Sequence, residues 1–380
     1  SQSRPSQRAA IIRSDKPDPL GMAIYSELIP IIVITGFLGS GKTTLLNKML
    51  KHPSLGDAAV LINEFGDVGL DHLLVEAVDD GVVVLESGCI CCTIREDLKK
   101  TILDLHDKRS KGEIPPFRRM VIETTGLADP APILFTLMSD TQLRYHYRLG
   151  MVVATVDLVN GWFQLDQNEE CVKQVTVADR IVLTKSDIAE AGETIRLQKR
   201  LVRINSSAEF MTAVAGDLDV ERLLTADLYD PERKGEDVLR WLRDEESRAG
   251  EAHDNHAVDT GRHDAHIHSF CIIQEEPIDW TAFGIWLTML LHTHGEDILR
   301  VKGMLNVVGV ETPVIVNGVH HIIHPPFHLN SWPSKDQRSR IIFIVRDLQR
   351  TQIEDSLSVF NHVGGALRPQ KISGSMSQQT

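Results

Sequence analysis

The sequence predicts an α/β fold in which helices cover both faces of a parallel sheet, followed by a smaller α+β domain. Three observations carry the prediction. Short apolar runs alternate with helical patterns over residues 28–228, a charged stretch interrupts them at 229–265, and a second set of strand and helix patterns fills 266–365. Continuous apolar strands separated by helices are typical of a parallel sheet that is buried on both faces.

Six apolar runs, rich in Val and Ile, predict the strands of the first unit. In chain order they read LIPIIVIT, AAVLIN, GVVVLE, RRMVIE, GMVVATVD and DRIVLT. The segment ahead of them, residues 1–27, is polar and contains proline. We therefore expect it to be a flexible N-terminal arm.

The stretch 229–265 is charged, rich in turn formers and poor in aliphatic residues, which predicts a linker. Four strands are expected beyond it, in IHSFCIIQ, ILRVKGMLNVVG, TPVIVNGVHHIIH and SRIIFIVRD. Two helices are expected in IDWTAFGIWLTMLLHTH and TQIEDSLSVFNHV. This pattern indicates a sheet backed by helices. Residues 366–380 are expected to form a disordered tail.

Composition excludes some classes of partner. The chain has 380 residues, of which 42% are hydrophobic and 24% charged, and its formal net charge is −13. Nucleic acid is disfavoured as a partner because a phosphate backbone is met by basic patches. No apolar run approaches the roughly 20 residues that span a bilayer, so no membrane association is expected. Without a secretory signal pattern we expect a cytoplasmic protein, whose five cysteines stay reduced.

The first predicted strand leads into GFLGSGKT, which matches the pattern Gly-x-x-x-x-Gly-Lys-Ser/Thr and precedes a helical run. Glycines allow backbone N–H groups to surround phosphate oxygens, and the helix N-terminus adds its positive end. We expect Lys42 to reach the β- and γ-phosphates and Thr43 to bind Mg²⁺. The predicted phosphate-binding residues are Gly36, Gly39, Ser40, Gly41, Lys42, Thr43 and Thr44.

Two later strand ends turn phosphate binding into nucleotide recognition. In MVIETTG, Glu123 is expected to hold Mg²⁺ through water, and the Gly126 N–H to lie near the γ-phosphate. An ordinary strand-end carboxylate is the alternative for Glu123.

In IVLTKSD, the Asp187 carboxylate can accept from guanine N1–H and the 2-amino group together, which adenine cannot offer. Lys185 would cover one face of the base, and Thr184 stands where such motifs usually have Asn. The segment favours GTP and GDP over adenine nucleotides.

With these residues the chain resembles the CobW-type P-loop GTPases, a family of metal-insertion and metal-trafficking proteins. The resemblance covers residues 28–347 and rests on segments in family order: ITGFLGSGKTTLLN, LINEFGDVGLD, ESGCICC, VIETTGLADP, ADRIVLTKSD and RVKG. It implies hydrolysis of GTP to GDP and phosphate, and delivery of a metal to a client metalloenzyme. The C-terminal domain is then the expected docking site for that client.

The family's Gly-Cys-x-Cys-Cys signature is reproduced by Cys89, Cys91 and Cys92. Thr93 and Glu96 form a capping box, so a helix is expected to start just after the cysteines. Thiols beside a helix N-terminus have depressed pKa values, and three thiolates suit Zn²⁺ or Cu(I), with Co²⁺ also possible. Three sulfurs leave a fourth position open, which suits a site that hands its metal on.

Two other interpretations of the cysteine cluster stay open: a strained disulfide between near neighbours, and buried inert thiols. The remaining cysteines, Cys171 and Cys271, lie on apolar patterns and are expected to pack in cores.

The segment NEFGDVGLD resembles the part of the family that senses the γ-phosphate. Within it, Glu64 and Asp67 are candidates for positioning water or for a supplementary metal contact, and solvated acids are an equal alternative. Because loops of a parallel sheet gather at one carboxyl edge, the phosphate and cysteine sites are expected to be neighbours. The hypothesis is that GTP orders this edge and that hydrolysis releases it.

Histidines cluster near the linker, where imidazole and carboxylate groups can gather divalent ions weakly. A solvated polar linker is the alternative. The cluster comprises His253, His256, His263, His266 and His268. Five further histidines are expected at a helix end, in strands or on the domain surface. They are His292, His294, His320, His321 and His324.

The function that best fits the sequence is a GTP-hydrolysing metallochaperone for Zn²⁺ or Co²⁺. One alternative is a P-loop phosphotransferase or ATPase acting on a small molecule. Another is a metal store or sensor without catalysis, in which nucleotide would be only structural.

Overall fold

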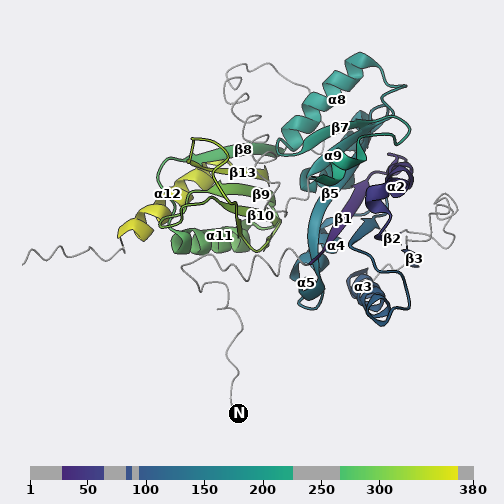
Figure 1. Ribbon diagram of the computed structural model, residues 1–380. Helices are drawn as coiled ribbons and strands as arrows, with labels where there is room; N and C mark the ends of the chain where they lie inside the picture. The colour runs from purple at the N-terminus through teal and green to yellow at the C-terminus, as the bar shows by residue number, and fades with distance from the viewer. Residues whose placement is uncertain (1–27, 64–82, 88–93, 226–265, 367–380) are drawn as a thin grey trace, which may run out of the picture.

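The computed structural model describes residues 28–63, 83–87, 94–225 and 266–366. They form two domains that lie side by side, an N-terminal domain built on a parallel sheet and a C-terminal domain built on an antiparallel one (Figure 1). The predicted fold class is thereby confirmed. In the part of the chain that is described, we find no helix with the length and apolarity needed to cross a bilayer.

The N-terminal sheet has seven strands in the order β3-β2-β4-β1-β5-β6-β7, and every neighbouring pair is parallel. The β1 strand is central, so its carboxyl end opens between β4 and β5. The strands are β1 (Ile29–Gly36), β2 (Ala58–Asn63), β3 (Val83–Ser87), β4 (Arg119–Glu123), β5 (Tyr147–Asp157), β6 (Arg180–Thr184) and β7 (Glu209–Ala213).

Helices cover both faces of this sheet, as the apolar runs predict. Alternate residues of β1 enter different cores: Ile31 and Val33 pack with α3 and α4, whereas Ile32 and Ile34 pack with α2 and α9. A short 3₁₀ turn, η1 (Pro53–Leu55), follows α2. The helices are α2 (Lys42–Leu50), α3 (Ile94–Lys111), α4 (Ala131–Ser139), α5 (Leu143–His146), α6 (Gly161–Gln167), α7 (Glu169–Val177), α8 (Ala191–Ile204) and α9 (Val220–Thr225).

The seventh strand, β7, is absent from the sequence prediction. Its sequence, EFMTA, mixes polar and apolar residues and is short, because it lies at the edge of the sheet and is covered less completely. Glu209 on this strand forms an ion pair with its register partner Arg180 of β6 and another with Arg222 of α9.

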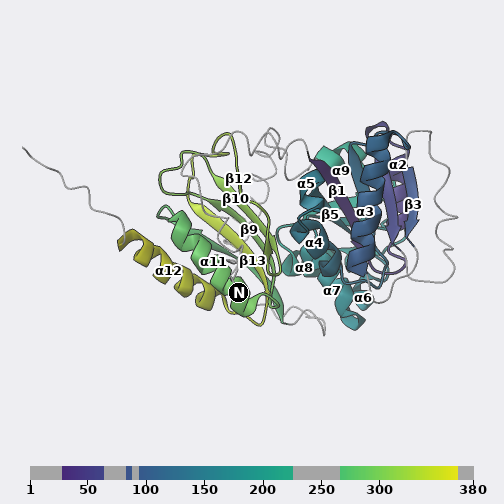
Figure 2. The ribbon, with the colours of Figure 1, turned by 90° about the horizontal axis from the view of Figure 1, so that it is seen from below.

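The C-terminal domain is an antiparallel sheet in the order β11-β10-β9-β13-β8, with β12 beside β10. Two helices, α11 and α12, lie together on one face (Figure 2), and Trp286 Nε1 of α11 donates to Ser356 Oγ of α12 at 2.9 Å. The elements are β8 (Ile267–Gln274), α11 (Trp280–His294), β9 (Ile298–Leu305), β10 (Val314–Val319), β11 (Ile322–Ile323), β12 (Phe327–His328), β13 (Ser339–Arg346) and α12 (Arg350–Ala366).

The face of this sheet away from α11 and α12 packs on the N-terminal domain. Ile267, Leu299 and Ile344 join a core formed by β5, β6 and the helices α6 to α8. At the centre of the contact, Asp179 forms buried ion pairs with Arg300 and with Lys302, the latter at 3.2 Å. Both cations belong to β9, and residues two apart on a strand share a face.

The buried His324 beside this ion cluster makes stability sensitive to acid. Burial, followed by the positive charge of Arg300, lowers the pKa of His324 to about 3. An unfolded histidine titrates near 6.5, so between about pH 6.5 and pH 3 the unfolded chain binds the extra proton. The contribution of His324 to stability is therefore complete above pH 6.5 and is lost as the pH falls toward 3.

We expect His324→Asn to reduce the loss of unfolding free energy between pH 7 and pH 4.5, measured by urea titration with tryptophan fluorescence. A matched change at the exposed His292 serves as the control. Equal acid sensitivity in wild type and His324→Asn would show that other groups dominate.

Candidate nucleotide-binding site

The predicted nucleotide-binding segments meet at the carboxyl edge of the N-terminal sheet. In register, Ile34 of β1 pairs with Glu123 of β4, and Gly36 pairs with Thr155 of β5. On the next strand, Asp157 pairs with Thr184 of β6. Segments up to 150 residues apart in sequence are thus within a few strand spacings of roughly 4.8 Å.

The backbone of the Gly-rich loop adopts conformations that require glycine. Gly39 and Gly41 have φ values of +72° and +94°, in the region that side chains rarely adopt. A Cβ on Gly36 would come within 2.5 Å of the Thr155 carbonyl oxygen. The α2 helix begins at Lys42, directly after the loop, so its N-terminus faces the same space. This is the geometry of a phosphate cradle.

Side chains from two neighbouring strands fasten the loop. Ser40 Oγ lies 2.6 Å from Thr155 Oγ1, and Thr184 Oγ1 donates to the Ser40 carbonyl at 2.8 Å. Thr184 Oγ1 is also 3.3 Å from the Val156 carbonyl. Thr184 stands where Asn is usual, and its hydroxyl connects the base-recognition segment directly to the phosphate cradle.

Oxygen ligands suited to Mg²⁺ converge beside the cradle. Thr43 Oγ1 donates to Glu123 Oε1 at 2.7 Å, and Glu123 is only 5% exposed. Lys42 Nζ donates to the Phe37 carbonyl at 3.2 Å, which turns its ammonium back over the loop. Thr124 anchors the end of β4 through its N–H to Ile34 O at 2.9 Å. A hydroxyl next to a buried carboxylate fits the hard, oxygen-preferring Mg²⁺.

The loop after β4 comes close to the cradle at Gly126. A Cβ built there would lie 2.7 Å from the backbone of Leu38 and 3.1 Å from Lys42 Nζ. Gly126 therefore lies close to the Gly-rich loop, and only glycine permits this approach. That its N–H faces the γ-phosphate stays a prediction.

We expect Gly126→Ala to displace the loop and to reduce GTP turnover roughly 10–100-fold, because misplacement by about 1 Å can cost that much. Steady-state hydrolysis with circular dichroism as a check of folding measures this. Gly192→Ala is the matched control, since a Cβ there meets nothing within 4 Å. Equal losses in both variants would contradict the steric explanation.

The predicted base-recognition segment is held by an acid, Asp157, that was not among the predicted site residues. Lys185 has φ +59°, and its Nζ lies 2.6 Å from Asp157 Oδ2. Burial acts to raise the pKa of Asp157, but hydrogen bonds from Lys185, Asn160 and the backbone outweigh it and lower the pKa. Asp187 is exposed, two residues beyond Lys185. The signal for Asp157 was present in the sequence, as the acid that closes the run GMVVATVD.

Several predicted site residues lie outside the described residues: Cys89, Cys91, Cys92, Glu64, Asp67, His253, His256 and His263. The same holds for the arm 1–27, most of the linker and most of the tail. The α3 helix begins at Ile94, in agreement with a helix start just after the cysteines. Among the residues that the structure describes, no group of three or more His, Cys, Asp or Glu side chains could hold a metal ion.

The two remaining cysteines differ. Cys171 is buried in the core between the domains, as predicted, and burial raises the pKa of its thiol to about 12. The prediction for Cys271 is wrong, because this residue is only half-buried. It lies on β8, the edge strand of the C-terminal sheet, which has one fewer neighbour to cover it.

Two histidines near the β10–β11 turn lie at the contact between the domains. The His321 ring contacts Phe135 of α4 in a tilted arrangement, with ring centroids 5.4 Å apart, and His324 is buried. His266, at the start of the C-terminal domain, lies 2.6 Å from Asp347 of the same domain, just after β13. Of the three, His321 and His324 connect the region of the β10–β11 turn with the N-terminal domain.

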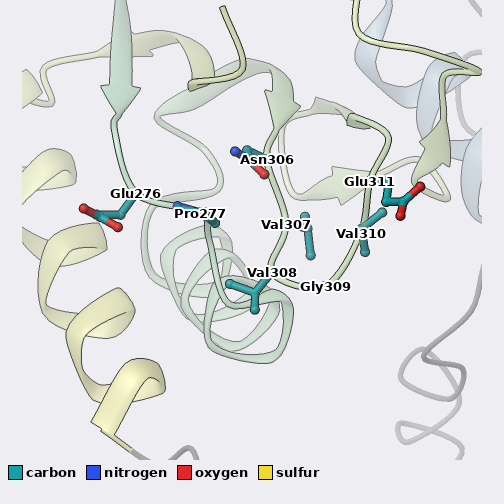
Figure 3. Close-up of a pocket in the computed structure, with 8 residues that line it drawn as sticks. All are labelled: Glu276, Pro277, Asn306, Val307, Val308, Gly309, Val310 and Glu311. Atoms are coloured by element: carbon teal, nitrogen blue, oxygen red, sulfur yellow. The ribbon is translucent and has the colours of Figure 1, made fainter.

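A hollow of about 460 Å³ in the C-terminal domain lies away from the Gly-rich loop. Figure 3 shows its two carboxylates, Glu276 and Glu311, on opposite sides and turned away from each other. Such an arrangement does not bring catalytic groups together, so we do not assign the reaction to it. The lining residues are Glu276, Pro277, Asn306, Val307, Val308, Gly309, Val310 and Glu311.

The parallel sheet, the Gly-rich loop ahead of α2 and the buried strand-end acid together have the architecture of a P-loop GTPase, with the predicted base-recognition segment at the same edge. Two family models match the chain: "CobW/HypB/UreG, nucleotide-binding domain" over residues 30–212 and "Cobalamin synthesis protein cobW C-terminal domain" over 267–361. The chain belongs to this CobW family.

Relatives and solved structures agree with that assignment. The zinc chaperone YjiA of Escherichia coli K12 is 34% identical, over 86% of this chain and 96% of its own. The zinc-regulated GTPase metalloprotein activator 1 of Schizosaccharomyces pombe is 28% identical, over 85% of this chain and 83% of its own. The crystal structure of Zn(II)-bound YjiA GTPase from E. coli matches with a TM-score of 0.65 at 28% identity, covering 88% and 99% of the two chains.

Proposed function

We propose that this protein is a GTP-hydrolysing metallochaperone that binds a transition metal at Cys89, Cys91 and Cys92. Zn²⁺ is the favoured metal, because relatives of similar length carry zinc in their names, and Co²⁺ is the alternative. The metal is then handed to a client metalloenzyme under the control of the bound nucleotide.

The observation that carries the proposal is the shared sheet edge. Ile62 of β2 pairs with Glu123 on one side and with Glu86 on the other. Ser87, the last residue of β3, is therefore about 10 Å across the sheet from the level of Glu123, two strand spacings away. Cys89 follows two residues later in the sequence. This proximity supports coupling between the phosphate site and the cysteine site.

In the proposed reaction, the Gly-rich loop and Lys42 hold the β- and γ-phosphates, while Asp187 and Lys185 select guanine. Thr43 and Glu123 would hold Mg²⁺, which supplies charge stabilisation to the phosphoryl group when bound. Gly126 supplies a backbone N–H near the γ-phosphate. Glu64 and Asp67 remain candidates for positioning the attacking water.

The proposal also places client docking on the C-terminal domain and the protein in the cytoplasm. The α11 helix supports the docking role, because it contains no Asp, Glu, Lys or Arg between Trp280 and His294. Its outward side chains include Ile285 and Met289, which are 47% and 54% exposed.

Titration of Zn²⁺ and Co²⁺ against the GDP form and a form with a non-hydrolysable GTP analogue tests the proposal. We expect metal affinity to differ between the two forms and Cys91→Ser to weaken binding in both. Cys271→Ser, outside the cluster, is the control. If Cys91→Ser changed neither the affinity nor its dependence on nucleotide, the proposed coupling would fail.

A comparison of GTP with ATP at equal concentration separates the alternatives. Equal turnover of the two nucleotides would favour a phosphotransferase or ATPase, against the expected guanine preference. Equal metal affinity with GDP and the GTP analogue would favour a metal store or sensor.

A further inference from the structure

The α7 helix carries a buried amide that contacts the loop after β4, the loop that approaches the Gly-rich loop at Gly126. Gln174 is 1% exposed, and its Nε2 donates to the carbonyls of Gly126 at 3.2 Å and Ala128 at 3.0 Å. Because both neighbours are carbonyl acceptors, the amide nitrogen must face the loop. No motif in the sequence pointed to this residue.

The contact fixes the part of the loop that approaches the phosphates. Gly126 lies close to Leu38 and Lys42 of the Gly-rich loop. Its N–H and its carbonyl are only three bonds apart in the backbone, so whatever holds the carbonyl also restricts the N–H. A side chain that holds the carbonyls of Gly126 and Ala128 therefore also sets where the Gly126 N–H points. Gln174 Oε1 is buried without a hydrogen-bond partner among the described residues. An apolar residue would avoid the cost of burying this unpaired oxygen. The presence of an amide therefore indicates that its two hydrogen bonds to the loop carbonyls are needed.

Other residues of α7 contact the rest of the loop and the C-terminal domain. Lys173 is 3.4 Å from Asp129, the residue that follows Ala128. At the start of the helix, Glu169 pairs with Arg346 of β13 at 3.1 Å. At its end, the Val177 carbonyl accepts from Arg300 of β9 at 2.9 Å. One nine-residue helix thus joins the loop to two strands of the other domain.

We propose that Gln174 is a positioning residue for GTP hydrolysis, and that α7 passes the state of the loop to the C-terminal sheet. The inference rests on the GTP-dependent reaction proposed above and adds the route by which nucleotide reaches the second domain. A loop that moves with the γ-phosphate pulls on Gln174 and Lys173, and the helix transmits the shift to Arg346 and Arg300.

Gln174→Met, which keeps the volume of the side chain and removes its donors, tests the positioning role. We expect kcat for GTP to fall about tenfold, with KM and GDP affinity within about threefold of wild type, because the loop acts mainly as the transition state forms. Gln167→Met, at an exposed position on α6, is the matched control. A wild-type kcat in folded Gln174→Met overturns the positioning role.

Gln174→Glu supplies a second readout. Its neutral carboxyl can donate one hydrogen bond to the loop, whereas its charged form is repelled by two carbonyl oxygens. The ratio of the kcat of Gln174→Glu to that of wild type should therefore rise as the pH falls from 8 to 6. A constant ratio would mean that the side chain only fills space, and it would overturn the proposal.

Hydrogen exchange of the full chain tests the relay. In wild type, amides of β9 and β13 should exchange differently with GDP and with a non-hydrolysable GTP analogue, and Gln174→Met should abolish the difference. No difference in wild type, or the same difference in the variant, overturns the relay. The comparison of GTP with ATP turnover is made on the wild-type protein alone. A failure of the proposed GTPase function would therefore appear there, independently of the results for the Gln174 variants.

Discussion

Glu123→Gln is expected to reduce GTP hydrolysis about 100-fold or more while leaving the fold intact. Glu123 is nearly buried at the end of β4 and accepts from Thr43 Oγ1 at 2.7 Å. An amide oxygen can accept the same hydrogen bond, so packing and strand register should persist. The negative charge is lost, however, and with it the stabilisation of Mg²⁺ beside the phosphates. Loss of one preorganised electrostatic group typically costs about 10²–10³ in kcat.

The measurement is steady-state phosphate release at several Mg²⁺ concentrations, together with GDP affinity and a thermal melt. We expect the defect of Glu123→Gln to diminish only partly at high Mg²⁺. Glu190→Gln, at an exposed position ahead of α8, provides a control with the same change of charge. Hydrolysis at the wild-type rate in Glu123→Gln would assign this carboxylate a purely structural role.

The phosphate cradle could be predicted because its determinants are contiguous in the chain. The loop from Gly36 to Thr43 needs a strand before it, a helix after it and glycines at fixed places, and all of these are visible in eight residues and their flanks. The order of strand ends along the sheet also follows from the rule that parallel strands share a carboxyl edge. Local chemistry and topology therefore sufficed to predict that Lys42, Thr43 and Glu123 lie together at one edge of the sheet.

Residues that act through long-range contacts were not predictable in the same way. The acid at the end of GMVVATVD was visible in the sequence, but its contact with Lys185 at the end of the neighbouring strand was not, and Gln174 meets a loop 46–48 residues earlier in the chain. A buried glutamine on an amphipathic helix has no spacing signature, because its partners are backbone carbonyls. The edge strand β7 was missed for a related reason. It pairs only with β6 and is covered less completely than the central strands, so its sequence lacks the continuous apolar run that predicts a buried strand.

The RVKG segment shows how a resemblance can mark residues without explaining them. The sequence identified the segment as a recurring stretch of the family, but gave it no role. In the structure, Arg300 and Lys302 extend from one face of β9 to the same acid, Asp179, which lies just ahead of β6. That acid also accepts from the Val152 N–H at 2.9 Å. The segment therefore fixes the C-terminal sheet to a central strand of the nucleotide-binding domain.

Asp179→Ala is accordingly expected to lower the free energy of unfolding by about 3–5 kcal/mol, because it leaves two buried cations without their counter-charge. Burial acts to raise the pKa of Asp179, and the charges of Arg300 and Lys302 outweigh it and lower the pKa. The stabilisation is thus present above the unfolded pKa of about 3.9 and is lost as the pH falls through the folded value. Urea titration at pH 7 measures the effect.

Asp336→Ala is the matched control, because Asp336 pairs with Arg338 and Arg340 within the C-terminal domain and is more exposed. We expect that change to cost less than Asp179→Ala, because Asp336 and Arg338 are partly exposed and only Arg340 is buried, whereas Asp179 and both of its partners are buried. Combining Asp179→Ala with Arg300→Met and Lys302→Met should recover much of the loss, since no unpaired charge then remains buried. If Asp179→Ala were no more damaging than Asp336→Ala, the domains would be held by their apolar contacts, Ile267, Leu299 and Ile344 among them, and the ion cluster would serve another purpose.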